Sequence, residues 1–267
     1  MAIAASIYFC IMKNRYLNIN AALAGEVLRR GVADEFRTLL ALKGVAKGGG
    51  AYFEVTPKLL NKLRGLCGWR CQRTPKRKIR KLLQMGWVGR DSSGTLYVRS
   101  FSYLLNQFDV RSSAVHKLSV PWICESKQKV KAALFSIATG KIIANRQYAL
   151  VRKNSAHTST GTCWKASFDP AAGETFSPDA LSVSFLAKRF EVSKATVHRW
   201  KHRAIDEGLI EREKRRFEFS GVTDVKAIRS AFPEHSHRTY LFFDSGSVAV
   251  QLTDKLSSTL QYKSRQQ

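Results

Sequence analysis

Acidic residues are scarce in this chain. Its 267 residues include 20 Asp and Glu against 45 Lys and Arg, which gives a formal charge of +25. So few carboxylates leave little material for paired acid–base catalysis. So large an excess of positive charge opposes a compact state unless a polyanion neutralises it. Nucleic acid suits that role, because each Lys or Arg placed against a phosphate releases condensed counterions, and an anionic membrane surface is the alternative.

Long apolar runs are also missing. No stretch approaches the ~20 residues that a transmembrane helix needs. The apolar residues 1–12 lack a preceding basic region and a cleavage site, so we expect a buried strand or helix there, not a signal peptide. The cysteines are odd in number and scattered, which predicts free thiols in a reducing cytoplasm: Cys10, Cys67, Cys71, Cys124 and Cys163. We expect a cytoplasmic, nucleoid-associated protein without a membrane partner.

The pattern of residues 34–118 predicts a first module of three helices and a hairpin. Leucines at near-helical spacing indicate a helix over residues 34–46. Thr56-Pro57 supplies an N-cap and a first helical residue for the second helix, and Thr74-Pro75 repeats that signal for the third. Residues 87–101 then predict a hairpin.

A similar order recurs in residues 119–267, the second module. An amphipathic helix is expected over residues 127–138 and a strand over residues 147–151. Residues 153–178 are rich in Ser, Thr and Gly and predict a flexible loop or insertion. The C-terminal segment has the composition of strands, which complete this module or pair with another chain, and its last residues, 262–267, predict a frayed end.

The sharpest motif lies within residues 181–219. Ser182 caps a first helix, and Ser193 caps a longer one that reaches Glu207. Residues at three- and four-residue spacings turn inward on the second helix: Val197, Trp200, Ala204 and Ile205. The outward set is Lys194, Ala195, Thr196, His198, Arg199, His202 and Arg203. A helix of this kind can enter the major groove of DNA.

This segment resembles the winged-helix DNA-binding superfamily, in the style of bacterial regulators whose motif ends in Gly-Leu-Ile before the wing. The resemblance assigns residues 193–203 to base recognition, and it assigns to the wing Lys214, Arg215 and Arg216. Glu191 departs from the pattern, because glycine is common at that place in the turn. A winged helix used for protein contacts is the alternative.

The first module is the more electropositive of the two. Residues 56–100 carry twelve bases and one acid, Asp91. Phosphate contacts give affinity without sequence information, so we expect this module to anchor the protein on the DNA backbone. The expected contacts come from the third helix: Arg73, Lys76, Arg77, Lys78, Arg80 and Lys81.

These patterns together predict an α+β, mostly helical fold with two tandem winged-helix domains, each of three helices and a β-hairpin wing, after an apolar segment at residues 1–33. Such an architecture in a strongly basic chain resembles the replication initiator proteins of plasmids and phages. The resemblance implies a sequence-specific protein of double-stranded DNA. A transcriptional regulator is the alternative, and a DNA-processing enzyme or a non-specific packaging protein is the alternative of another class.

No constellation in the sequence predicts catalysis, a metal or a cofactor. Cys67 and Cys71 could share a helix face, but no second Cys/His pair completes a zinc site. His235 and His237 with Tyr240 resemble the centre of nicking enzymes, yet the polar Ser236 between them counts against it. We therefore expect a binding protein, not an enzyme, with DNA as partner and self-association through its C-terminal strands left open.

Overall fold

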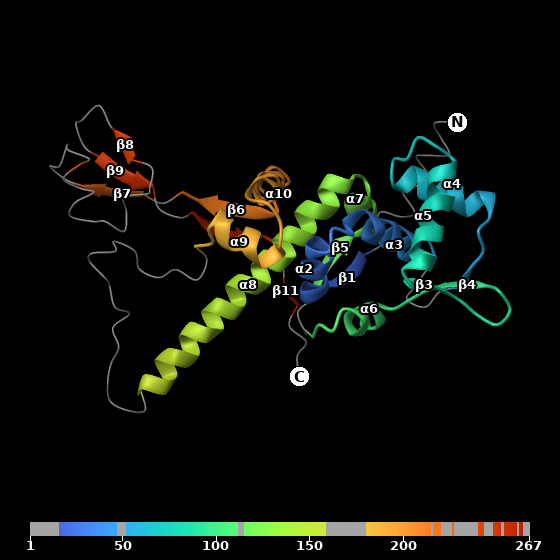
Figure 1. Cartoon of the computed structure of the whole chain (residues 1–267), viewed down its shortest axis with the longest axis horizontal. Coiled ribbons are helices and arrows are strands. Elements are labelled where there is room, and N and C mark those ends of the chain that lie inside the picture. Colours follow the sequence, from blue (N-terminus) through green and yellow to red (C-terminus); the bar gives the residue numbers. More distant parts are fainter. Residues whose placement is uncertain are drawn as a thin grey trace. The chain divides into compact units, whose positions relative to one another are not determined.

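A computed structural model of the chain is drawn in Figure 1. It describes residues 16–46, 52–111, 115–158, 180–214, 216–219, 226, 240–242, 248–251, 254–260 and 262–263. The chain forms two compact units. One comprises residues 1–141, 187–210 and 258–267, and the other comprises residues 142–186 and 211–257. The predicted boundary between residues 118 and 119 falls inside the first unit.

The described part is mostly helical with small antiparallel sheets, which confirms the α+β class. The described part of the first unit begins with β1 (Tyr16–Asn20) and α2 (Ala21–Arg29), both inside the predicted apolar segment at residues 1–33. Residues 1–12, predicted as a buried strand or helix, lie outside the described residues. Strand β1 pairs with β5 (Val115–Ser119), which also pairs with β11 (Tyr262–Lys263). The prediction that the chain frays from residue 262 onward is therefore wrong at Tyr262 and Lys263.

Helix α3 (Ala33–Val45) is the centre of the first unit. It packs against α4 (Pro57–Leu66), α5 (Arg73–Gln84) and α7 (Val120–Cys124). Phe36, Leu39, Leu40 and Leu42 are fully buried along it. Its close approach to α7 needs a glycine, because a Cβ on Gly44 would lie 2.5 Å from Cγ1 of Val120. The predicted helix over residues 34–46 is confirmed.

The helix starts of the first module are partly as predicted. Thr56 caps α4 by accepting a hydrogen bond from the Leu59 amide at 3.2 Å, as expected. Helix α5, in contrast, begins at Arg73 with Gln72 as N-cap, so the prediction that Thr74 is the cap is wrong. Thr74 and Pro75 lie in its first turn, where the missing amide of proline leaves no helical hydrogen bond unmade.

The predicted hairpin is present but shorter than expected. Strands β3 (Val88–Arg90) and β4 (Leu96–Val98) pair, and β2 (Tyr52–Phe53) joins the other edge of β4. The prediction of strand up to Phe101 is wrong, because Ser100 accepts a hydrogen bond from the Tyr103 amide at 3.1 Å and so caps α6 (Phe101–Gln107).

Helix α8 (Lys127–Thr158) extends far beyond the predicted end at Ala138. The strand predicted at residues 147–151 and the loop predicted from residue 153 are wrong as far as Thr158, because residues 141–158 contain no glycine or proline to end the helix. Residues 159–178 of that loop lie outside the described residues. The two capped helices follow as predicted, as α9 (Val183–Phe190) and α10 (Lys194–Asp206).

The strands after α10 do not form the predicted wing hairpin. Strand β6 (Ile210–Glu213) pairs with β10 (Lys255–Ser258). Strand β7 (Arg216–Phe219) joins a different sheet, of order β7-β9-β8, with β8 (Tyr240–Phe242) and β9 (Val248–Gln251). Two ion pairs accompany the β6 pairing, from Arg212 to Asp254 at 3.9 Å and from Lys255 to Glu213 at 3.5 Å.

Candidate nucleic-acid interface

Helix α10 is fixed in the first unit by a triangle of aromatic rings. The centre of the Trp200 ring lies 6.2 Å from that of Phe190 and 6.2 Å from that of Phe135. The centres of the two phenylalanine rings are 5.9 Å apart. Trp200 comes from α10, Phe190 from the end of α9 and Phe135 from α8. Val197 and Ala204, one turn to either side of Trp200, are fully buried. The inward positions predicted from spacing are confirmed, with Ile205 half-buried.

The turn before α10 has the geometry of a tight helix–turn–helix connection. Ser193 caps α10 by accepting a hydrogen bond from the Thr196 amide at 3.2 Å. Glu191, which stands where glycine is common, adopts the left-handed conformation with φ +54°. This conformation costs a non-glycine residue ~1–2 kcal/mol. Its carboxylate pairs with Arg29 of α2 at 3.0 Å, which ties the turn to a second helix.

The solvent side of α10 carries the residues predicted to read DNA. Thr196 is half-buried, and the others of the predicted set are exposed: Lys194, Ala195, His198, Arg199, His202 and Arg203. The Arg199 guanidinium folds back along its own helix, donating to Thr196 Oγ1 at 3.3 Å. A long, exposed guanidinium on the first turns of such a helix can swing outward and donate two hydrogen bonds to a guanine edge.

Two further contacts restrain the later turns of α10. The Nε2 atoms of His198 and His202 lie 3.2 Å apart. Arg203 pairs with Glu207 at 2.7 Å, and Glu207 lies 3.8 Å from Lys129 of α8. Since Arg203 already has a carboxylate partner, it offers less charge to a phosphate than Arg199 does.

The three wing residues are described unequally. Lys214 is exposed directly after β6. Arg215 lies outside the described residues, and Arg216 opens β7, where its backbone pairs with Gln251. Because β6 and β7 belong to different sheets, Lys214 and Arg216 do not sit on one hairpin.

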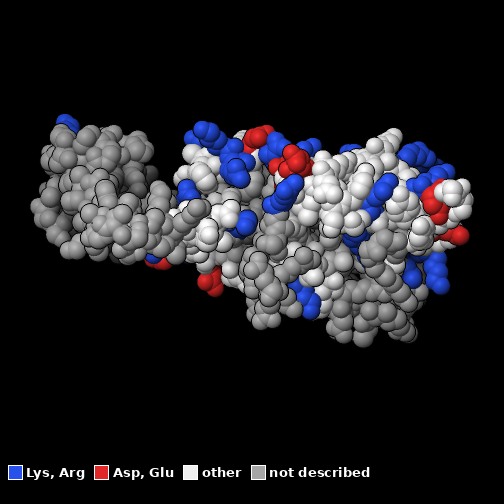
Figure 2. All heavy atoms as spheres, turned by 90° about the horizontal axis from the view of Figure 1, so that it is seen from below, with Lys and Arg blue, Asp and Glu red and all other residues white. Residues whose placement is uncertain are grey.

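Helix α5 presents a stripe of four exposed cations. Their positions are three, four and seven residues apart, which places them on one side of a helix: Arg73, Lys76, Arg77 and Arg80. The opposite side, with Ile79 and Leu82, is buried against the core. None of the four pairs with an acid in the part of the chain that the structure describes. Figure 2 shows Lys and Arg outnumbering Asp and Glu over one face of the described surface.

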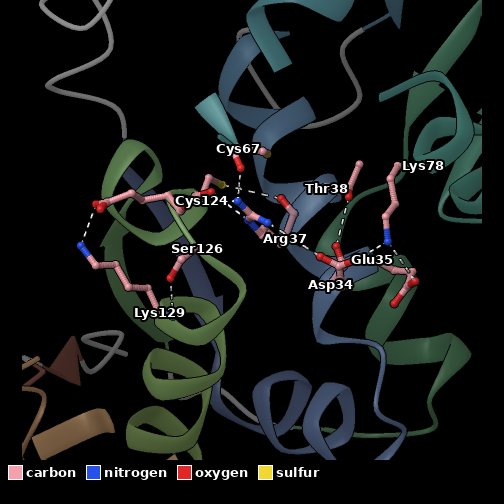
Figure 3. A network of polar contacts seen from close by, with 10 residues as sticks. Asp34, Glu35, Arg37, Thr38, Cys67, Lys78, Cys124, Ser126 and Lys129 are labelled. Carbon is pink, nitrogen blue, oxygen red and sulfur yellow. Dashed lines mark hydrogen bonds and ion pairs between the residues drawn. The ribbon is translucent and has the colours of Figure 1, made fainter. Parts of the chain in front are cut away.

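The other two predicted cations of α5 are held by acids of α3, and Figure 3 shows one of them, Lys78. Lys78 makes an ion pair with Asp34, and Lys81 pairs with Glu35 at 2.6 Å. Burial alone would raise the pKa of Glu35, but the hydrogen bond from Lys81 and the charge of Lys78 bring the net pKa below its ordinary value. Counting charges within residues 56–100 missed these partners, because both acids precede that stretch. Lys78, only 15% exposed, is therefore a poor candidate for a phosphate contact.

Arg37 locks the helices that carry this surface (Figure 3). Its guanidinium is 7% exposed and donates to the backbone carbonyls of Cys67, Cys124 and Glu125, the last two at 2.8 and 3.0 Å. These carbonyls lie at the C-terminal ends of α4 and α7, where carbonyl groups have no hydrogen-bond donor within their own helix. One buried cation of α3 thus joins α3 to the ends of two other helices.

Two cations of α8 were missed at the sequence level. Burial lowers the pKa of Lys131, and the like charges of Lys127 and Arg199 lower it further. Lys131 therefore lies close enough to Arg199 of α10 to feel its charge. The same Lys127 acts on Asp34, the partner of Lys78 on α5. The lysines in the run KQKVK at residues 127–131 could have pointed to this basic surface, but this segment was interpreted only as an amphipathic helix.

The remaining candidate residues that the structure describes do not assemble into a chemical centre. Cys67 is buried at the end of α4 and Cys71 is exposed before α5, so the shared helix face was wrong. The thiol of Cys124 is a neighbour of Cys67, and burial raises its pKa. Within the described ranges no three His, Cys, Asp or Glu side chains gather as metal ligands. His235 and His237 lie outside the described residues, as does the side chain of Tyr240.

No helix within the described residues is both long and apolar enough to cross a bilayer. Comparison of the chain with family models, with characterised proteins and with solved structures finds no match.

Proposed function

We propose that this protein binds double-stranded DNA sequence-specifically, with α10 as the recognition helix in the major groove. One observation carries the proposal: α10 is anchored by Val197, Trp200 and Ala204 while its first turns hold Lys194, Ala195 and Arg199 exposed behind a tight capped turn. Such a rigidly held helix with an open polar side is what readout of base edges requires.

The stripe on α5 is proposed as the anchor on the DNA backbone. Its four exposed cations carry charge without base-reading geometry, so they supply affinity for any sequence. Lys127 and Lys131 of α8 extend this role toward Arg199.

The architecture we favour is a pair of winged-helix domains. The order α3, β2, α4, α5, β3 and β4 supports the first of them, since three helices and a three-stranded sheet are the parts of that fold. For the second, α8, α9 and α10 support the helical part, and β6 completes its sheet with β10 in place of a local hairpin. The use that we propose for two such modules is initiation of replication on a plasmid or phage.

The experiment is a selection of bound fragments from a random duplex pool, followed by footprinting and by binding of variants. Arg199→Ala should lower affinity for the selected site about 5- to 150-fold, because a bidentate contact to a base is worth ~1–3 kcal/mol. Its affinity for random duplex should fall much less. Arg111→Ala, which removes the same charge from an exposed residue beyond α6, is the matched control.

Equal losses on selected and random duplex would overturn the assignment of α10 as reader. Repeated asymmetric sites spanning about two helical turns support the initiator, whereas a palindrome would point to a dimeric transcriptional regulator, because half-site symmetry mirrors protein symmetry.

A further inference from the structure

Three tyrosines and one arginine form a continuous row from the outer face of the β2-β4-β3 sheet to the start of α6. In the register of the sheet, Tyr97 of β4 lies opposite both Tyr52 of β2 and Gly89 of β3. Side chains alternate between the faces of a strand. The neighbours Phe53, Leu96 and Val98 are buried in the core, so Tyr52 and Tyr97 share the outer face.

Glycine at position 89 lets the Tyr97 ring lie flat on the backbone of β3. A Cβ there would come within 2.3 Å of Tyr97 Cζ, so no other residue fits under the ring in this position. The ring of Tyr52 lies 5.7 Å from that of Tyr97 and is tilted by 52°. Beyond Tyr97, the Arg99 guanidinium lies 4.9 Å from the Tyr97 ring and 4.4 Å from the ring of Tyr103. We call Tyr52, Tyr97, Arg99 and Tyr103 the tyrosine row.

The two ends of the tyrosine row are open to solvent. Tyr52 is 62% exposed and Tyr103 is 36% exposed, which is uncommon for large aromatic side chains arranged next to one another. Within the described residues, Nε of Arg99 is buried without a hydrogen-bond partner, so the guanidinium is held mainly by the two rings. Planar rings flanked by a stacked guanidinium are a surface suited to flat, electron-rich ligands.

We propose that the tyrosine row binds single-stranded DNA by stacking of its bases. Base–aromatic stacking with backbone charge nearby is how proteins hold single strands without reading sequence. Within a duplex, neighbouring bases are stacked at ~3.4 Å and have no free face. Rings 5.7 Å apart and tilted can each receive one base only from a strand whose bases have separated.

The proposal concerns residues that the duplex-binding helices do not use. Stacking of bases on the tyrosine row does not depend on the proposed function. Only the choice of DNA over RNA rests on it, since α5 and α10 in the same compact unit are proposed to bind duplex DNA.

The test is binding of a fluorescently labelled oligothymidine of about 12 nucleotides, within the site sizes of known single-strand modules. Tyr52→Ala should weaken binding ~10-fold, and Tyr52→Phe should retain it, because stacking needs the ring and not the hydroxyl. Tyr52 is mostly exposed, so neither change disturbs the core. Tyr148→Ala, on a 69% exposed tyrosine of α8, is the matched control and should leave binding unchanged.

Equal binding by Tyr52→Ala and Tyr52→Phe would overturn the stacking site, as would a loss of duplex binding by Tyr52→Ala as large as its loss of oligothymidine binding. Tighter binding to oligouridine would overturn the choice of DNA. Arg199→Ala separates this proposal from the proposed function, because it should spare oligothymidine binding while lowering affinity for the selected duplex.

Discussion

Lys43 carries a charge inside the core of the first unit, and removing that charge should stabilise the protein. Its side chain lies on α3, is 4% exposed, and places Nζ 4.7 Å from the centre of the Phe101 ring. Burial lowers the pKa of Lys43 from its ordinary 10.5 to about 8. That difference corresponds to about 3 kcal/mol of destabilisation by the charged form.

The sign of the pH dependence follows from the two protonation states. Between about pH 8 and 10.5 the unfolded chain keeps the proton of Lys43 while the folded chain has lost it, so stability from this group rises with pH. Below pH 8 both states are charged and the folded state bears the full penalty. From pH 7 to pH 9.5 the expected gain is about 2 kcal/mol.

The assay is urea unfolding of the wild type and of Lys43→Met at pH 7 and pH 9.5. At pH 7 the variant should be more stable by about 2 kcal/mol, because it loses the charge penalty of about 3 kcal/mol while repacking around Met costs ~1 kcal/mol. By pH 9.5 this advantage should have largely gone. Taking the difference between the two proteins at each pH removes the titration of every other group. A difference that does not change with pH would show that the fold does not lower the pKa of Lys43.

Two further predictions concern the turn before α10 and the stripe on α5. In urea unfolding, Glu191→Gly should be more stable than Glu191→Ala by about 1 kcal/mol. Both variants lose the ion pair with Arg29, and only glycine adopts the left-handed φ without strain. Equal stabilities would show that the backbone at Glu191 is not strained. The double variant Arg73→Ala, Arg77→Ala should weaken binding to selected and random duplex alike, and it should flatten the slope of log K against log salt by ~1 per lost phosphate contact. Lys78→Met should leave the slope unchanged, because Lys78 is paired with Asp34. A slope that responds to Lys78 and not to Arg73 and Arg77 would reverse the assignment.

Local signals in the sequence predicted the helices well where caps and spacing agree. Ser193 and Trp200 defined α10 because a cap and a buried side chain are both set within one helix. Local signals were insufficient where a partner lies far along the chain. The pairing of β6 with β10 joins segments more than forty residues apart, and nothing within residues 208–219 distinguishes that pairing from a local hairpin.

The candidate surface shows the same division between local and distant information. Spacing identified the exposed residues of α10, and a count of charges identified the cations of α5. It did not find that Lys78 and Lys81 are engaged by Asp34 and Glu35, which come from another helix. Nor did it find Lys131, whose nearness to Arg199 depends on how α8 packs against α10. The type of a residue determines whether it can carry charge, and tertiary packing determines whether that charge is free to contact a phosphate or is already paired.

The central claim is that α10 gives this protein a preference for one DNA sequence. The most direct measurement is the ratio of affinities of the wild-type protein for its selected duplex and for a scrambled duplex of the same length and composition, at one physiological salt concentration. If α10 reads sequence, this ratio should be ~10³ or more. A ratio near one, with steep salt dependence on both duplexes, would contradict it and identify a protein that binds DNA through charge alone.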